Sequence, residues 1–233
     1  MPCTLPASLA DAAVCRGSFH AVLGGEAGEA VFADFSAALQ KAQAEGRILT
    51  ASLFRYENHL FFYAEGLNRP FTPQGLCPAL DAALLPWPPA LGEAEPRPWA
   101  AMQPYFYHDV PTTAADWQQG RCPQRRRGRI ALLPPDSWCS YMEHHLRIVT
   151  EGLVEGDRWH LICVQEGVLF SYLEEPRTNV NIRHQPGAHS PELDAWIAAD
   201  PESHFARFTP EQKANPDSGH NFVFLPRIAG TED

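Results

Sequence analysis

Hydrophobic positions between Asp136 and Glu175 change their spacing partway along the segment. The first part repeats apolar residues about every 3.6 positions, which predicts a helix with one buried face. That face carries Trp138, Tyr141, Met142, Ile148 and Val149. Two short strand patterns follow, Trp159–Val164 and Val168–Leu173, joined by a tight turn. The segment therefore predicts a helix, capped by Asp136 or Ser137 and stopped near Gly152, and then a hairpin.

One titratable residue, His145, lies on the apolar face of this predicted helix. Residues four apart share a helix face, so Tyr141 and His145 should meet while Glu143 points elsewhere. Imidazole titrates near neutral pH and is therefore suited to proton transfer. The alternative is a hydrogen-bonded core histidine.

The first half of the chain repeats the same order of elements. The expected elements are strand Ser18–Leu23, helix Glu29–Glu45, strands Ile48–Phe54 and His59–Glu65, helix Gly75–Leu85 and strand Met102–His108. Phe61 pairs with Phe170 and Glu65 with Glu174, each 109 residues later. PALDAAL matches PELDAWI, and the strand ending at His108 matches the terminal NFVFLP. The pattern indicates an internal duplication.

The predicted fold class is α+β, with two tandem ferredoxin-like halves that form a pseudo-dimeric α/β barrel. Each half reads strand, helix, strand, strand, helix, strand, which is the ferredoxin-like order. The predicted boundaries are an N-terminal arm at 1–15, a first half at 16–108, a linker at 109–128, a second half at 129–228 and a tail at 229–233.

Charge and hydropathy narrow the range of partners. The formal net charge is −10, which argues against nucleic acid or an anionic membrane as the main partner. Five arginines between Arg121 and Arg129 are a local exception, which we interpret as a solvated linker, with an anion or partner contact as the alternative. No transmembrane or signal pattern is present, so a cytoplasmic location is expected.

Motifs for cofactors and metals are missing from the sequence. The six cysteines show no zinc-finger spacing, which favours reduced thiols. Four histidines gather in the second half without the HxH or HxxxH spacing typical of ligands, so no metal site is predicted. These are His184, His189, His204 and His220. No phosphate loop or dinucleotide fingerprint occurs, and we expect no cofactor.

The segments YMEHH and HLICVQEGVLFSYLE, followed by ELDAWIAADPESHFARF and NFVFLP, are similar to the L-rhamnose mutarotase family, a dimeric α/β barrel. The resemblance implies an isomerase that interconverts the anomers of a small sugar. It also implies that His145 is the proton donor and that Tyr141 contacts the sugar. His160 stands where a second tyrosine is expected, and Phe205 stands at the place of paired tryptophans.

Further site predictions follow from sugar chemistry and from the repeat. Trp196 or Phe205 could stack on the apolar face of a sugar ring, and His160, His144 or a water could supply the base. In the first half, Phe32 and Ser36 occupy the places of Tyr141 and His145, so only one half is expected to be active. The expected partner is a sugar or similar metabolite, bound by a monomer with an internal pseudo-dimer or by a homodimer.

Two other functions stay open on the sequence alone. One is a non-catalytic barrel that binds a small metabolite. The other is an α/β barrel enzyme of oxygenase or cyclase type that acts on a hydrophobic metabolite. Fold does not decide among them, but apolar surroundings of His145 would favour the hydrophobic metabolite.

Overall fold

The structure, a computed structural model, describes residues 6–150, 157–177, 191–212 and 221–231. The chain forms two compact units. Unit 1 comprises residues 1–102, 111–123 and 226–233, and unit 2 comprises residues 103–110 and 124–225. Each unit contains a five-stranded antiparallel sheet.

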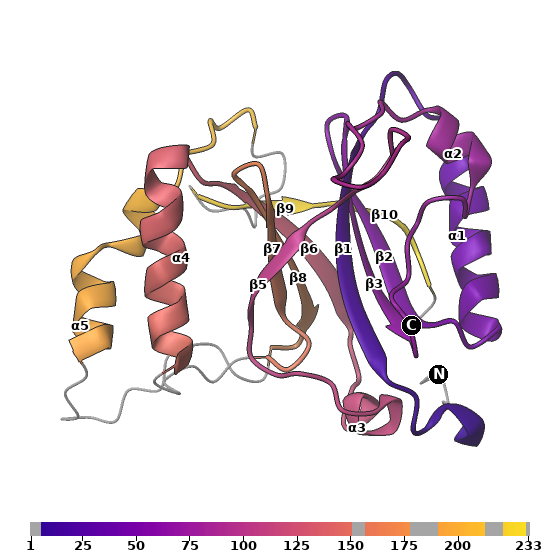
Figure 1. Cartoon of the computed structure of the whole chain (residues 1–233), viewed down its shortest axis with the longest axis horizontal. Coiled ribbons are helices and arrows are strands. Elements are labelled where there is room, and N and C mark those ends of the chain that lie inside the picture. Colours follow the sequence, from indigo (N-terminus) through magenta and orange to yellow (C-terminus); the bar gives the residue numbers. More distant parts are fainter. Residues whose placement is uncertain (1–5, 151–156, 178–190, 213–220, 232–233) are drawn as a thin grey trace. The chain divides into compact units, whose positions relative to one another are not determined.

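Unit 1 places α1 and α2 on one face of its sheet (Figure 1). After a 3-10 helix (Ala7–Leu9), its elements are β1 (Val14–Val22), α1 (Glu29–Ala44), β2 (Ile48–Tyr56), β3 (His59–Leu67), α2 (Pro78–Ala82), β4 (Ala100–Ala101), α3 (Ala114–Gln118) and β10 (Arg227–Gly230). The strand order is β10-β2-β3-β1-β4. The inner face of α1 is confirmed, because Phe32, Phe35, Leu39 and Ala42 are all buried.

Unit 2 repeats this arrangement, with α4 and α5 beside its sheet (Figure 1). Its elements are β5 (Gln103–Tyr107), β6 (Arg125–Leu132), α4 (Pro135–Thr150), β7 (Leu161–Gln165), β8 (Val168–Glu175), α5 (Pro191–Ala198), a 3-10 helix (Pro201–His204) and β9 (Val223–Leu225). The strand order is β5-β7-β8-β6-β9. The strands β7-β8-β6-β9 correspond to β2-β3-β1-β4 of unit 1, and β5 occupies the edge position that β10 has there.

The predicted fold class is confirmed as α+β with two tandem ferredoxin-like halves. The strands β2-β3-β1-β4 and β7-β8-β6-β9 follow the same order, and the hairpin in each sheet turns at a glutamate with positive φ. These are Glu57 at 54° and Glu166 at 50°, which stand at equivalent places of the repeat. The predicted domain boundaries stay a prediction.

The strand expected to close the first half, Met102–His108, is placed differently from the prediction. The short β4 closes the first sheet, and β5 pairs instead with β7 in the second sheet. In the same way β9 closes the second sheet, and β10 pairs with β2 in the first. The edges of β2 and β7 would otherwise present unpaired N–H and C=O groups, and the exchanged strands satisfy them.

The interpretation of the arginine run as a solvated linker is wrong. The Arg121 side chain is 2% exposed and donates from Nη1 and Nη2 to the Glu65 carboxylate at 2.7 and 3.0 Å. Tyr63 donates to the same carboxylate at 2.6 Å, and Tyr172 does so to Glu174 at 2.6 Å in unit 2. A buried carboxylate needs such partners, and the sequence pattern alone did not show that Glu65 is buried.

Helix α4 covers the second sheet with a narrower face than the sequence predicts. Tyr141 and His145 are buried, as expected, but Trp138 is 40% exposed. Gly152, the expected stop, lies outside the described residues. In the part of the chain that the structure describes, no helix meets the length and hydropathy needed to cross a membrane.

Candidate functional site

The side chains of α4 that face β5 form a cluster of aromatic rings around one imidazole in unit 2. The Tyr141 and His145 rings lie 4.1 Å apart between centroids. On the β5 side, the Tyr105 ring lies 5.9 Å and the Phe106 ring 5.2 Å from the imidazole, both edge to face. Phe205 packs edge-on against Tyr141 at 4.9 Å. We call these five residues the α4–β5 cluster.

A β-bulge explains how two consecutive residues of β5 reach the same imidazole. Neighbouring side chains of a regular strand point to opposite faces of a sheet. The pairing of β5 with β7 shifts register between Pro104 and Phe106, so Tyr105 is the extra residue. A bulge bends the strand and re-aims side chains, and bulges are frequent next to active sites.

The hydrogen bond of His145 fixes its protonation. Its Nδ1 lies 3.0 Å from the Tyr141 carbonyl oxygen, which can only accept, so the proton sits on Nδ1 and Nε2 carries a lone pair. Burial lowers the pKa of His145 to about 4, and His144 and His204 nearby act in the same direction. The bond to Tyr141 opposes this shift only in part. His145 is therefore a neutral imidazole at pH 7.

Tyr105 adds a second polar group to the cluster. Its hydroxyl is sealed from solvent and makes no hydrogen bond of normal length to the described residues. Burial raises the pKa of Tyr105 well above its ordinary value, and the neighbouring Tyr141 hydroxyl raises it further. The Tyr105 hydroxyl therefore stays protonated and can donate a hydrogen bond to an acceptor.

His160 lies near Phe106, the residue of β5 that also contacts His145. Its ring lies 6.3 Å from Phe106 and is stacked on His108 at 5.6 Å. His160 is 3% exposed, and its backbone N–H donates to the Asp157 carbonyl at 2.9 Å. Phe106, whose ring lies near both imidazoles, thus connects His160 to the α4–β5 cluster.

The other predicted residues divide into those in the cluster and those that cannot be placed. Phe205 is 8% exposed and belongs to the cluster. Trp196 lies in α5, but its side chain is outside the described residues. In the described ranges, no group of three or more potential metal ligands occurs. His184, His189 and His220 lie outside those ranges.

Sequence analysis missed Tyr105, Phe106 and His108, which β5 contributes to unit 2. Their strand was assigned to the first half, so no spacing argument could bring them to His145. A signal was present in the run of aromatic residues from Tyr105 to His108, which is dense for a strand at the edge of a sheet.

The corresponding place in unit 1 holds no proton-transfer group. Phe32 is buried at the position of Tyr141, and Ser36 stands at the position of His145. The Ser36 hydroxyl accepts the Gly230 N–H at 3.3 Å, so it anchors the exchanged strand β10. The equivalent position of each helix thus contacts an exchanged strand. In α1 the contact is the Ser36 hydroxyl on β10, and in α4 it is the His145 imidazole on β5.

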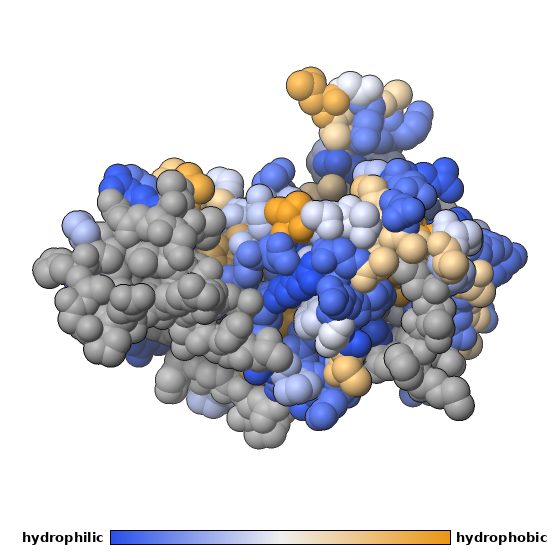
Figure 2. Space-filling view, turned by 90° about the horizontal axis from the view of Figure 1, so that it is seen from below, coloured by the Kyte–Doolittle hydropathy of each residue, from blue (hydrophilic) through white to orange (hydrophobic). Residues whose placement is uncertain are grey.

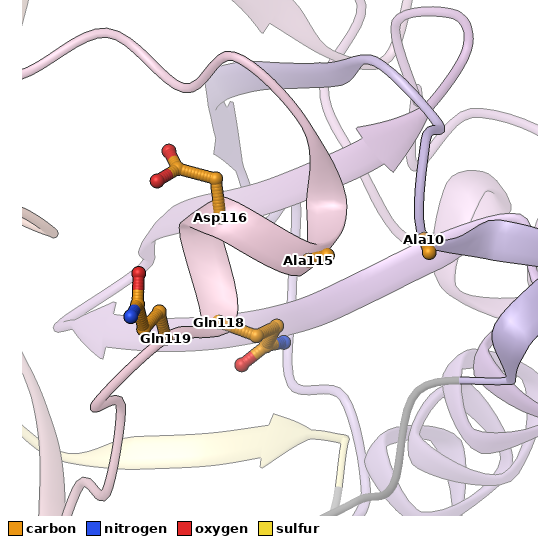
Figure 3. Close-up of a pocket in the computed structure, with 5 residues that line it drawn as sticks. All are labelled: Ala10, Ala115, Asp116, Gln118 and Gln119. Carbon is orange, nitrogen blue, oxygen red and sulfur yellow. The ribbon is translucent and has the colours of Figure 1, made fainter.

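Polar side chains at the hollow beside α3 do not converge. Ala10, Ala115, Asp116, Gln118 and Gln119 line it, with a volume of about 480 Å³. Figure 3 shows the side chains of Asp116, Gln118 and Gln119 pointing in different directions. On the face in Figure 2, hydrophilic residues predominate among those coloured, and strongly hydrophobic ones stand apart. Neither view offers a better candidate than the α4–β5 cluster.

No family model matches the sequence, and no curated protein matches it. Two solved structures are similar over nearly the whole chain, and each is named a "putative monooxygenase". That from Lactobacillus acidophilus NCFM is 6% identical with a TM-score of 0.39, and the match covers 94% of this chain and 96% of that one. That from Fusobacterium nucleatum is 9% identical with a TM-score of 0.41, and the match covers 95% of each. This is a distant likeness.

The prediction of a sugar mutarotase is wrong. Neither similar structure is named an isomerase. The proton-donor role also conflicts with the site, because at a pKa of about 4 only about one His145 in a thousand carries a second proton at pH 7.

Proposed function

We propose that unit 2 is the active half of an α+β enzyme that acts on a small hydrophobic metabolite bearing an acidic hydroxyl, such as a phenol or an enol. The observation that carries this proposal is the neutral His145 imidazole with its proton fixed on Nδ1, held among aromatic rings. Its Nε2 lone pair is suited to accept a hydroxyl proton from a ligand that stacks on those rings.

Proton removal by His145 would give an electron-rich oxyanion, the form from which oxygenase and cyclase chemistry can both begin. A developing negative charge beside the imidazole raises its pKa, so the base strengthens as the proton moves. The Tyr105 hydroxyl could then donate to the oxyanion, as preorganised donors do in a water-poor site. His145 would be the base and Tyr105 the stabilising donor.

A non-catalytic binding protein is the second candidate, and one observation favours it. The pKa of about 4 makes His145 a weak base, which suits hydrogen-bond acceptance without proton transfer. Both candidates predict the same ligand class, and they differ in turnover.

Binding of a hydroxylated ring tests the shared part of both candidates. We expect 1-naphthol to bind more tightly than naphthalene, which has the same rings without the hydroxyl. In His145→Asn, the amide nitrogen can still donate to the Tyr141 carbonyl, but the Nε2 acceptor is gone. We expect this variant to lose about tenfold in naphthol affinity, the value of one hydrogen bond, with naphthalene unchanged.

The matched control is His144→Asn. The His144 ring lies 6.2 Å from the His204 ring and is not part of the α4–β5 cluster, so this variant should bind both ligands like the wild type. Equal binding of the two ligands to the wild type would contradict the proposed ligand class. Consumption of dioxygen with electron-rich phenols, lost in both His145→Asn and Tyr105→Phe, would select an oxidative enzyme, whereas binding without any product would select the binding protein.

A further inference from the structure

A separate cavity in unit 1 lies at the β4 edge of the first sheet, away from α3. It has a volume of about 430 Å³. Its wall includes Phe19 of β1 and Trp99 before β4, and its rim includes Thr72, Gln74 and the segment Glu93–Arg97. A cavity of this size is in the range of small-molecule sites.

Backbone bonds hold Arg97 in place at this rim. The Trp87 N–H donates to the Arg97 carbonyl at 2.8 Å, and the Arg97 N–H donates to the Trp87 carbonyl at 3.1 Å. The two residues thus form a β-bridge that closes the base of the loop between them. Arg97 is therefore carried on a fixed backbone position rather than on the free part of the loop.

The Arg97 guanidinium has unused donor capacity. Its Nε is shielded from solvent, and within the described ranges it has no hydrogen-bond acceptor. Arginine stays charged at every accessible pH, and a shielded donor without a partner is costly. A carboxylate is the group that matches a guanidinium best, because two parallel N–H···O bonds can form.

The part of the lining that Phe19 and Trp99 form is aromatic, and Trp99 is held in place. Trp99 is 3% exposed, donates from Nε1 to the Asp81 carboxylate at 2.9 Å and stacks on Phe35 at 6.3 Å. Phe19 is only half-buried and leaves part of its ring accessible. A ligand here gains most if its body is flat and apolar.

Two acidic residues at the rim limit the charge that the cavity accepts. The Glu93 carboxylate accepts the Ala90 N–H at 3.0 Å, and Glu95 lines the same rim. Both carboxylates repel anions, and the repulsion grows with the charge of the ligand. One arginine against two glutamates favours a singly charged carboxylate over a doubly charged phosphate.

We propose that this cavity binds a small monoanionic carboxylate with an aromatic body, its carboxylate on Arg97 and its ring against Phe19 and Trp99. Gln74 also lines the cavity and carries an amide that can act as a further donor. The site lies wholly in unit 1, so it is independent of the chemistry proposed for unit 2.

Titration of the intact protein with phenylacetate, followed through the Trp99 indole resonance, tests the proposal. We expect saturable binding, with little or none for 2-phenylethanol, which has the same body without the charge, or for inorganic phosphate. Arg97→Gln should weaken phenylacetate binding about 10- to 100-fold, and Arg97→Lys should weaken it less. Glu95→Gln should narrow the preference for phenylacetate over phosphate.

Two outcomes would overturn the proposal. The first is the absence of a saturable shift at Trp99 with phenylacetate at millimolar concentrations. The second is phenylacetate binding that Arg97→Gln leaves unchanged while the dispersed amide spectrum shows a folded protein.

Discussion

His145 couples the stability of unit 2 to pH. Its folded pKa of about 4 lies below the ordinary value of 6.5, so the unfolded chain takes up the proton first as the pH falls. The neutral form stabilises the fold fully above pH 6.5, and this stabilisation is lost as the pH falls toward 4. At about 1.4 kcal/mol per pH unit, the loss between pH 6.5 and 5 is about 2 kcal/mol.

Chemical unfolding of the wild type and of His145→Asn at pH 7 and pH 5 measures this effect. Other groups titrate in both proteins, so the difference between their unfolding free energies isolates His145. We expect the advantage of the wild type to shrink by about 2 kcal/mol between the two pH values. A difference that stays constant would show that the folded and unfolded pKa values are alike.

At the residue scale, the sequence predicted part of the site because helical spacing is local. Tyr141 and His145 share a face through a fixed geometry of four residues, and both are buried in the structure. Tyr105 and Phe106 could not be predicted in the same way, because their approach to His145 depends on a pairing between β5 and β7 and on a bulge. The buried state of Glu65 likewise depends on Arg121, which lies 56 residues away.

At the element scale, the exchanged strand β10 is anchored by buried hydroxyl groups. Thr231 is 1% exposed, its hydroxyl lies 3.1 Å from that of Thr50, and it accepts the Ala51 N–H at 3.2 Å. Thr231→Val keeps the shape but removes the hydroxyl, which leaves these groups without their partner. We expect a loss of about 1–3 kcal/mol in unfolding free energy.

Thr231→Ser retains the hydroxyl and is the matched variant. Hydrogen exchange of the β2 amides, read together with denaturant unfolding, should show faster exchange in Thr231→Val than in Thr231→Ser. If the valine variant proved as stable as the serine variant, the anchoring of β10 would rest on its backbone bonds alone.

Element types and order could be predicted from the sequence, whereas sheet membership of the exchanged strands could not. The spacing of hydrophobic residues and the residue types at the turns identify α1 and both hairpins, since these signals lie within each element. The strand Met102–His108 was also expected, but its own residues do not determine which sheet it joins. That choice depends on the free edges of β2 and β7, which only the assembled sheets present.

At the scale of the whole molecule, strand exchange links the unfolding of the two units through the chain itself. Only Met102 separates β4 from β5, and only Pro226 separates β9 from β10. Each sheet thus ends on a strand whose immediate neighbour in the chain belongs to the other sheet. If one sheet unfolds, the exchanged strand in that sheet loses its pairing partner. The strand of the same sheet that adjoins the other exchanged strand in the chain also loses its fixed position. We therefore expect a single calorimetric transition with equal calorimetric and van't Hoff enthalpies.

Arg121→Met tests this coupling, because it destabilises unit 1 alone. It leaves the buried Glu65 carboxylate without its cation, a change that costs about 3–5 kcal/mol. Slowly exchanging amides of β8 in unit 2 should lose protection by a similar free energy, although no residue of unit 2 has changed. Arg47→Met removes a partly exposed pair with Glu45 and should leave β8 as it was. Two resolved transitions, or loss of protection confined to β3, would mean that each unit releases its borrowed strand without unfolding the other.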